Sequence, residues 1–298
     1  MINEYSMIIE LLIIVNYFLL KFLCPGTPLS TKPKTFLKGL DRIKELGLNG
    51  EEVQFGRYVF LEKEQSKEVK PIAENLELDL TIHGPYYINL NAKEPEKVEM
   101  SINRIKGSAH RGFLMGAKSV CFHPAYRFDN TRDEITKKVR QAMTQIEEYL
   151  IENNFTIDVR PESGGKHAQF GTLDELLDSC EGFKQIKPCI DFAHIMATSN
   201  ATLNNYEAFC TMLETVKLRL GPGALKEMHI HAGTVAFNDK GEIKALNLDD
   251  PESQFNYREL LQALVDYQVE GWIVAETPSI EEGALLLKNT YKDLRNNQ

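Results

Sequence analysis

The sequence has few of the residues that mark disulfide-bonded or unfolded proteins. Its 298 residues include only five cysteines, 19 glycines, 12 prolines and one tryptophan. Five is an odd number and no Cys-x-x-Cys pair occurs, so the cysteines predict neither a disulfide framework nor a thiolate metal site, and they suit a reducing compartment such as the cytoplasm. The composition, 43% hydrophobic and 26% charged, is typical of a globular protein with a large core. We interpret all the cysteines as small buried hydrophobic residues or bystanders: Cys24, Cys121, Cys180, Cys189 and Cys210.

Basic residues are fewer than acidic ones, and three common active-site motifs are absent. The 34 Lys and Arg residues stand against 43 Asp and Glu, and the formal net charge of -9 argues against a broad basic surface for nonspecific nucleic-acid binding. The chain has no Gly-x-x-x-x-Gly-Lys-Ser/Thr loop, no Gly-x-Gly-x-x-Gly after a strand and no Gly-x-Ser-x-Gly elbow. The sequence therefore predicts neither a nucleotide-binding phosphate loop nor a hydrolase with a nucleophilic serine.

One apolar run, residues 7–23, stands out near the N-terminus, although Glu10, Asn16 and Lys21 interrupt it. Its length is marginal for a membrane span, and it lacks the basic segment and small-residue cleavage site of an export signal. We predict an apolar N-terminal extension over residues 1–20, a first buried strand from Lys21 to Cys24, and no stable membrane partner. A membrane or interfacial anchor is the alternative.

Beyond this run, short β-branched segments alternate with segments of helical periodicity, repeating about every 30 to 35 residues. The helical segments carry apolar stripes such as Phe36, Leu40 and Ile43. No Pro- or Gly-rich linker divides the chain, so we predict one α/β domain over residues 21–298, a single (β/α)8 TIM barrel with a short apolar N-terminal extension. Its eight strands are expected at Phe22–Cys24, Glu52–Phe55, Leu78–Ile82, Ser119–Phe122, Thr156–Arg160, Pro188–Asp191, Met228–Ile230 and Trp272–Ala275.

Histidine or acidic residues stand at the ends of six consecutive predicted strands, which would meet at the mouth of a TIM barrel, where active sites lie. Imidazole and carboxylate ligands without thiolates are typical of zinc or manganese sites. So many candidates are enough for at least two ions, with Glu162 or Asp191 as a bridge. His110, in a predicted helix, and His167, in a glycine-flanked loop, are interpreted as non-ligating. The candidate ligands are His83, His123, Glu162, Asp191, His194, His229, His231 and Glu276.

Short motifs surround these residues: HGPYYINL at His83, FHP at His123, RPESGGK at Glu162, CIDFAH at Asp191, MHIHAG at His229 and VAETP at Glu276. Over about residues 21–295 they resemble the endonuclease IV family of apurinic/apyrimidinic (AP) endonucleases, among the xylose-isomerase-like barrels. The resemblance implies that Tyr86 helps to wedge DNA open at a lesion. It also implies three zinc sites: His83, His123 and Glu162 in the first, Glu162, Asp191, His229 and Glu276 in the second, and His194 in the third.

The third implied zinc site departs from the family pattern. The family completes it with an Asp-x-His element in the loop after strand seven, but the matching stretch here, GEIKALNL, has Ile243 and Ala245, which cannot bind metal. Candidate substitutes are His231, Asp239, Glu242 and Asp249.

By resemblance, the protein is expected to be a zinc-dependent AP endonuclease, which hydrolyses the phosphodiester 5′ to an abasic site in double-stranded DNA during base excision repair. Two zinc ions about 3.5 to 4 Å apart can bind the scissile phosphate. A third zinc ion is expected if the substitute residues bind it. Glu162 is the candidate catalytic residue, which positions or deprotonates the attacking water. We expect a cytoplasmic monomer. Candidate DNA contacts on predicted mouth loops are Arg57, Tyr86 and Tyr87, with Tyr126, Arg127 and Lys166 as further rim residues.

Two other functions stay open at this stage. The same barrel also supports a sugar isomerase or epimerase that uses a divalent metal, Mn²⁺ included. A homologue that binds DNA lesions without cleaving them is the second alternative, because Ala245 leaves the third metal site incomplete.

Overall fold

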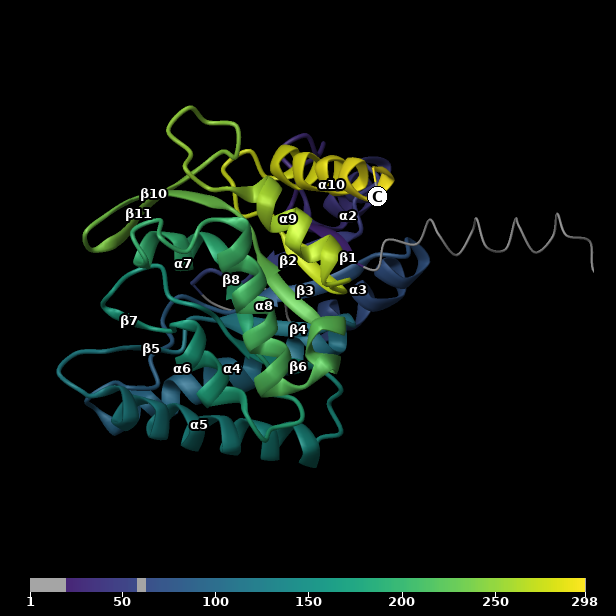
Figure 1. The fold of residues 1–298 in the computed structure, drawn as a ribbon. Helices are drawn as coiled ribbons and strands as arrows, with labels where there is room; N and C mark the ends of the chain where they lie inside the picture. Colours follow the sequence, from purple (N-terminus) through teal and green to yellow (C-terminus); the bar gives the residue numbers. More distant parts are fainter. Residues whose placement is uncertain (1–19, 58–62, 298) are drawn as a thin grey trace, which may run out of the picture.

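The computed structural model describes residues 20–57 and 63–297, and its centre is a barrel of eight parallel strands (Figure 1). The strands follow the hydrogen-bonded order β6-β4-β3-β2-β1-β12-β9-β8. At the remaining seam, backbone bridges join Val159 to Ile186 and Glu162 to Cys189, so the barrel is nearly closed. The strands are β1 Leu20–Cys24, β2 Gly50–Gln54, β3 Asp79–His83, β4 Ser119–Phe122, β6 Asp158–Pro161, β8 Cys189–Asp191, β9 Met228–His231 and β12 Gly271–Val274.

Helices surround the barrel and cover its apolar outer face. Each presents a buried stripe, as α5 does with Ile135, Val139 and Ile146. The threonine caps of α5 and α6, Thr131 and Thr172, each form a capping box with a glutamate three residues on. The helices are α2 Phe36–Glu45, α3 Lys63–Asn75, α4 Pro95–Met115, α5 Arg132–Glu152, α6 Leu173–Cys180, α7 Phe192–Thr198, α8 Tyr206–Leu220, α9 Tyr257–Asp266, α10 Glu281–Asn296 and the 3-10 helix η1 Pro222–Lys226.

Two small antiparallel sheets lie at the carboxyl ends of the barrel strands. In one, β5 (Ala125–Tyr126) pairs with β7 (Gln169–Phe170). In the other, β10 (Thr234–Asn238) pairs with β11 (Gly241–Leu246), and this hairpin stands beside α7 (Figure 1). The sequence patterns predict neither sheet. β5 and β7 have only two residues each, and β10 and β11 lie in the segment interpreted as the loop after strand seven.

The predicted fold is confirmed. Each of the eight predicted strands is present, displaced by at most two residues at either end, and the first strand begins at Leu20. The predicted boundary between an N-terminal extension and the barrel stays a prediction, since residues 1–19 lie outside the described part of the chain. Among the helices of that part, none is both long and apolar enough to span a membrane.

The barrel interior contains an unusual layer of polar side chains. TIM barrels ordinarily fill this space with Val, Ile and Leu. Here Glu52, Thr81, Cys121 and His229 are fully buried on β2, β3, β4 and β9. His229 on β9 contacts both Ser119 on β4 and Glu52 on β2, and β9 is adjacent to neither strand, so these contacts cross the interior.

Candidate metal centre

Glu162 lies at the centre of the mouth, fully buried one residue after β6. Four imidazoles surround its carboxylate. His83 Nε2 and His123 Nδ1 lie 3.3 and 3.6 Å from Oε2, and His231 Nδ1 and His194 Nδ1 lie 2.9 and 3.7 Å from Oε1. Since these residues come from β3, β4, β9 and α7 or the residues directly after them, the barrel ends bring them together.

The mouth residues form groups whose ligand atoms lie close enough for a shared cation. One group is Glu162, Asp191, His231 and Glu276, and another is His123, Glu162 and His194; within each, the ligand atoms lie within 4.8 Å of one another. Glu162 belongs to both groups, so its two oxygens are placed to bridge. Carboxylate and imidazole ligands in this arrangement are typical of catalytic zinc or manganese centres.

Two buried atoms of the mouth also indicate a bound cation. Glu162 Oε2 and His123 Nδ1 have no hydrogen-bond partner although both are buried. Such an unsatisfied polar atom ordinarily costs about 1–3 kcal/mol, and a metal ion between them would remove that cost. The residues present therefore fit a metal.

The charge states of Glu162 and His123 suit a metal, whereas His83 would release a proton to bind one. Burial opposes the ionised form of Glu162, but His123 and His231 hold its pKa well below the usual range, so the carboxylate stays charged. Burial also opposes the charged form of His83, but the neighbouring Glu162 raises its pKa to about 10. Burial lowers the pKa of His123, which favours the neutral imidazole that binds metals.

One expected ligand lies elsewhere. His229, which the family resemblance assigns to the second zinc site, lies one layer deeper, where its Nε2 is 2.9 Å from Glu52 and its Nδ1 is 2.9 Å from Ser119 Oγ. The place beside Asp191 and Glu276 belongs to His231. The two histidines are two residues apart and share one face of β9, so both point inward and only their depth differs.

The third implied site has one of its candidate substitutes in place. Glu242 Oε2, from β11, lies 3.4 Å from His194 Nε2, whereas Ile243 is 59% exposed and Asp239 is exposed in the hairpin turn. A Cβ at Gly165 would lie 2.6 Å from the His194 ring and 2.8 Å from Glu242 Oε2, so glycine permits this close approach. His110 and His167 lie in α4 and in a turn, outside the ligand groups found among the described residues.

Glu52 is a site residue that the sequence prediction missed. It is fully buried, and its Oε1 lies 3.1 Å from His231 Nε2. A carboxylate on the second nitrogen fixes the tautomer and orientation of a metal-binding histidine. The available signal was a glutamate at the start of the predicted strand Glu52–Phe55, since glutamate is almost never fully buried without a partner.

The predicted DNA-contacting side chains line the rim. Tyr86 and Tyr87 are 66% and 61% exposed, and Arg57 is exposed. The Tyr86 amide donates to the Gly56 carbonyl, which joins the loops after β3 and β2. Arg127, an expected rim contact, instead forms a bidentate ion pair with buried Glu175, at 2.6 and 2.7 Å, so it stabilises the β5 and α6 region.

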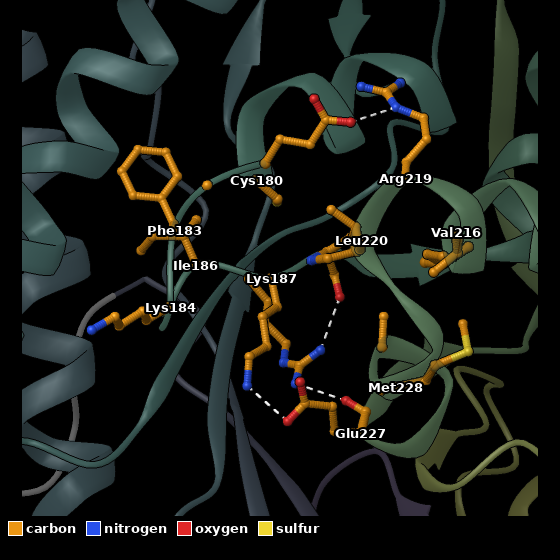
Figure 2. A pocket seen from close by; sticks show the side chains of 17 residues that line it. Cys180, Phe183, Lys184, Ile186, Lys187, Val216, Arg219, Leu220, Glu227 and Met228 are labelled. Carbon is orange, nitrogen blue, oxygen red and sulfur yellow. Dashed lines mark hydrogen bonds and ion pairs between the residues drawn. The ribbon is translucent and has the colours of Figure 1, made fainter.

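A cavity of about 410 Å³ lies at the opposite end of the barrel, the base, where α6 and α8 end (Figure 2). Most of its charged side chains are ion-paired: Lys187 with Glu227 at 2.8 Å, and Arg219 with Glu181 at 2.6 Å, whereas Lys184 is exposed. Such pairs leave few charges that could recognise a ligand. The candidate centre is therefore at the mouth.

Barrel, mouth and ligand set together define a TIM barrel of the metal-binding type. The chain belongs to the xylose isomerase-like TIM barrel family (AP endonuclease family 2), whose model matches residues 40–293. It is 37% identical over 269 residues to an uncharacterized protein of Methanocaldococcus jannaschii, covering 90% of this chain and 96% of the relative. It is also 27% identical over 207 residues to a probable endonuclease 4 of Oceanobacillus iheyensis, covering 62% of this chain and 67% of the relative.

Solved structures of two activities share the fold. A D-tagatose 3-epimerase-like protein superposes with a TM-score of 0.69 at 18% identity, covering 88% of this chain and 94% of that protein. Endonuclease IV from Thermus thermophilus superposes with a TM-score of 0.65 at 16% identity, covering 92% of this chain and all of that protein. At these identities the likeness shows the fold alone.

Proposed function

We propose that the protein is a zinc-dependent AP endonuclease, which hydrolyses the phosphodiester bond 5′ to an abasic site in double-stranded DNA during base excision repair. The number of candidate ligands at the mouth carries the proposal. The group of Glu162, Asp191, His231 and Glu276 has enough ligands for one ion, and a second group adds His123 and His194 to the same Glu162. The relatives named probable endonuclease 4 support the same activity.

The metal ions would supply charge stabilisation for the phosphate and a lowered pKa for the attacking water. His83, His123 and Glu162 would hold one zinc, and Glu162, Asp191, His231 and Glu276 a second, with manganese as the alternative metal. His194 and Glu242 would hold a third ion. In this assignment His231 replaces His229 and Glu242 replaces the family's Asp-x-His element.

The chain's own residues then act on the substrate. Glu162, ionised at the centre of the mouth, would position the attacking water by accepting a hydrogen bond, a role that suits its low pKa better than uptake of the proton. Tyr86 and Tyr87 offer exposed rings for stacking on bases next to the lesion, and Arg57 offers a phosphate contact. Because the net charge is -9, few phosphate contacts are available, and we expect DNA affinity to fall only shallowly with salt.

The same proposal places the protein in the cytoplasm as a monomer. All five cysteines are free thiols, as a reducing compartment requires.

A sugar epimerase is the second candidate, and a specific observation favours it. The mouth includes a compact four-residue group, Glu162, Asp191, His231 and Glu276, which is sufficient for a single-ion enzyme, and the epimerase-like neighbour shares the fold. The ligands beyond that group distinguish the candidates, because a single-ion epimerase does not need His123 and His194 on Glu162.

The deciding experiment measures bound metal and DNA incision on one purified sample. The substrate is a duplex with a single abasic-site analogue, and the undamaged duplex is the control. Two or three zinc ions per chain with incision 5′ to the analogue support the proposal. Metal without incision, together with C3 epimerisation of a ketohexose, would replace it with the epimerase, and lesion binding without either reaction would indicate a non-catalytic homologue.

A further inference from the structure

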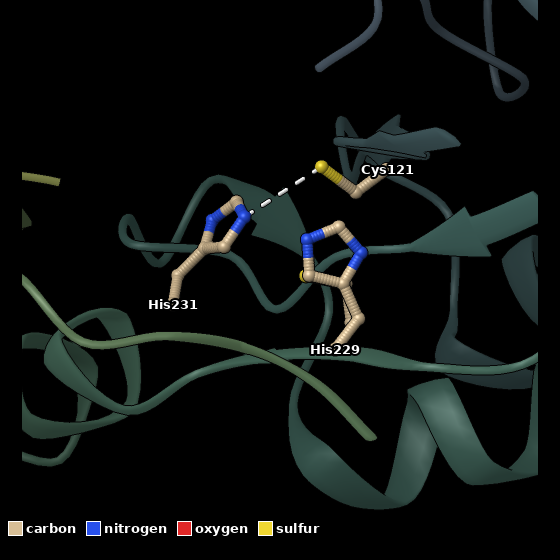
Figure 3. Close-up of side chains that lie close together, drawn as sticks. Cys121, His229 and His231 are labelled. Atoms are coloured by element: carbon tan, nitrogen blue, oxygen red, sulfur yellow. Dashed lines mark hydrogen bonds between the residues drawn. The ribbon is translucent and has the colours of Figure 1, made fainter. Parts of the chain in front are cut away.

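A second group of potential metal ligands lies inside the barrel, below the mouth. Cys121 on β4, Cys189 on β8, and His229 and His231 on β9 each offer one ligand atom, and these atoms lie within 4.8 Å of one another. Figure 3 shows Cys121, His229 and His231. All four residues are buried. We call Cys121, Cys189, His229 and the adjoining Glu52 the deep cluster.

Two distances from Cys121 in and beside the deep cluster are close to those between ligands of one tetrahedral ion. Zn–S bonds of about 2.3 Å and Zn–N bonds of about 2.0–2.1 Å separate a sulfur and a nitrogen ligand by about 3.6 Å. Cys121 Sγ lies 3.7 Å from His231 Nε2 and 3.4 Å from Glu52 Oε2. His229 Nε2 lies 2.9 Å from the same Glu52 oxygen, a hydrogen-bond distance. The ligand atoms of Cys121, Cys189, His229 and His231 all lie within 4.8 Å of one another.

The surroundings of His229 also fit a ligand. Its Nδ1 is 2.9 Å from Ser119 Oγ, so Nε2 is the nitrogen that faces the cluster. Metal-binding histidines ordinarily engage their second nitrogen with a protein group in this way. This contact crosses the barrel interior from β9 to β4 and fixes the orientation of the His229 ring.

The five cysteines divide into two classes. Cys24 and Cys180 are buried, and with Cys210 they belong to no ligand group found among the described residues, as small hydrophobic residues would. Cys121 and Cys189 face two imidazoles and a carboxylate instead. Two thiols in the interior layer of a TIM barrel, where aliphatic side chains are usual, are better explained by a ligand role than by packing.

We propose that Cys121, Cys189 and His229 bind a zinc ion inside the barrel, with the fourth ligand supplied by the Glu52 and His231 pair. The thiols bind as thiolates and release their protons to solvent as the ion enters. The site is closed and lies below the mouth, with which it shares only His231, so its role is structural. It ties β2, β4, β8 and β9 together and fixes His231, whose Nδ1 faces Glu162 2.9 Å away.

This inference does not depend on the AP endonuclease proposal. Because every ligand is buried, the ion has to enter before the barrel closes and leaves only when the barrel opens. We therefore expect a chelator to remove the mouth ions from the folded protein quickly and the deep ion only on unfolding.

The test is X-ray absorption at the zinc edge of the wild-type protein after chelation of the mouth ions, followed by reconstitution with cobalt(II) during refolding. We expect one retained zinc with two sulfur neighbours, and a thiolate-to-cobalt charge-transfer band in the near ultraviolet. Cys189→Ala should abolish that band, whereas Cys180→Ala, at a buried cysteine outside the cluster, should keep it. A Cys121→Ala variant is a less specific test, because Cys121 also lies near the mouth residues His83 and Glu162.

Zinc without sulfur neighbours, or no zinc left after chelation, would overturn the proposal and show that the deep cluster holds together by hydrogen bonds alone. The absorption measurement needs no variant, so it decides the matter even if Cys189→Ala fails to fold. Asp191→Asn separates the two proposals, because it should impair incision and mouth metal binding while the thiolate band remains.

Discussion

The two ends of the barrel hold buried charge in different ways. At the base, Asp158 accepts from Arg160 and Lys187 at 2.8 and 3.1 Å, and Asp79 accepts from Lys21 and the Trp272 ring at 2.6 and 2.8 Å. At the mouth, the carboxylates and imidazoles crowd one another, and Glu162 Oε2 and His123 Nδ1 lack a hydrogen bond; at the base, Arg160 Nε also lacks one, but the same guanidinium is ion-paired with Asp158. Paired charges stabilise a fold, whereas incompletely paired ones mark a place for a ligand. The base is therefore expected to affect stability and the mouth to affect activity.

The largest effect expected from this comparison is at Glu162. Glu162→Gln keeps the shape but removes the charge that the mouth histidines face, so incision of an abasic duplex should fall by more than the roughly 100-fold typical of an outer-shell change. Single-turnover rates and metal content measure it, and exposed Glu282→Gln is the control. A variant that incises at the wild-type rate would show that Glu162 is not the catalytic residue.

The converse experiment is at the base. Asp158→Ala leaves Arg160, which is 1% exposed, and Lys187 without their shared carboxylate. Arg160 keeps the Pro188 and Glu227 carbonyls, and Lys187 keeps the Glu227 carboxylate. The loss in denaturant unfolding should therefore be that of a charged hydrogen bond, about 1.5–3 kcal/mol, while the folded variant keeps its incision rate. Asp41→Ala, which breaks the exposed pair with Lys38, should cost less than about 1 kcal/mol. Equal losses would contradict the assignment of the base to stability.

The adjacent buried glutamates Glu51 and Glu52 allow a test of whether a buried carboxyl group affects metal affinity only when it contacts a metal-binding histidine. Glu52→Gln removes the carboxylate that orients His231, and metal affinity should fall by about 10- to 100-fold in a chelator competition. Glu51→Gln is the matched control. Burial raises the pKa of Glu51 to about 8, so its carboxyl is already mostly neutral at pH 7 and the amide should change little. Similar losses from both would mean that the two positions affect packing only.

A smaller effect is expected at the third metal position. Glu242→Ala removes the carboxylate 3.4 Å from His194, and the metal content should fall by up to one ion per chain, with incision reduced by about tenfold. Ile243→Ala, at the next and exposed position, is the control. An unchanged metal content would leave His194 without a role in metal binding.

The smallest effect concerns an acid on the mouth side that is fully hydrogen-bonded. Glu281 accepts from the Leu29 and Ser30 amides at 2.8 and 2.9 Å. Burial opposes its charge, but these amides hold its pKa below the usual value. Its contribution, about 1.5–3 kcal/mol, is therefore present above the unfolded pKa near 4.3 and lost as pH falls through the lower folded value. Glu281→Gln should remove that part of the acid dependence of unfolding without affecting metal content.

The fold and most of the mouth were predictable from local patterns. A strand of four or five residues and a helix of two turns or more each leave their own periodicity, so all eight strands were found. The two small sheets were not predicted: β5 and β7 have only two residues each, and the β10–β11 hairpin lies in a segment interpreted as a loop. The Arg127 to Glu175 pair was missed for a related reason, since it joins residues that are far apart in the sequence and that only folding brings together.

The sequence by itself determined the barrel, its order of strands and the chemistry of the mouth, because alternating hydrophobicity and residue type are local properties. Only the tertiary structure decided the depth of each inward-facing side chain. His229 and His231 obey the same alternation, and the stagger of strands around the barrel selects which one reaches the mouth. The same stagger places Glu52, Cys121 and Cys189 one layer below. Depth in a closed barrel depends on every strand at once, so no single segment of sequence specifies it.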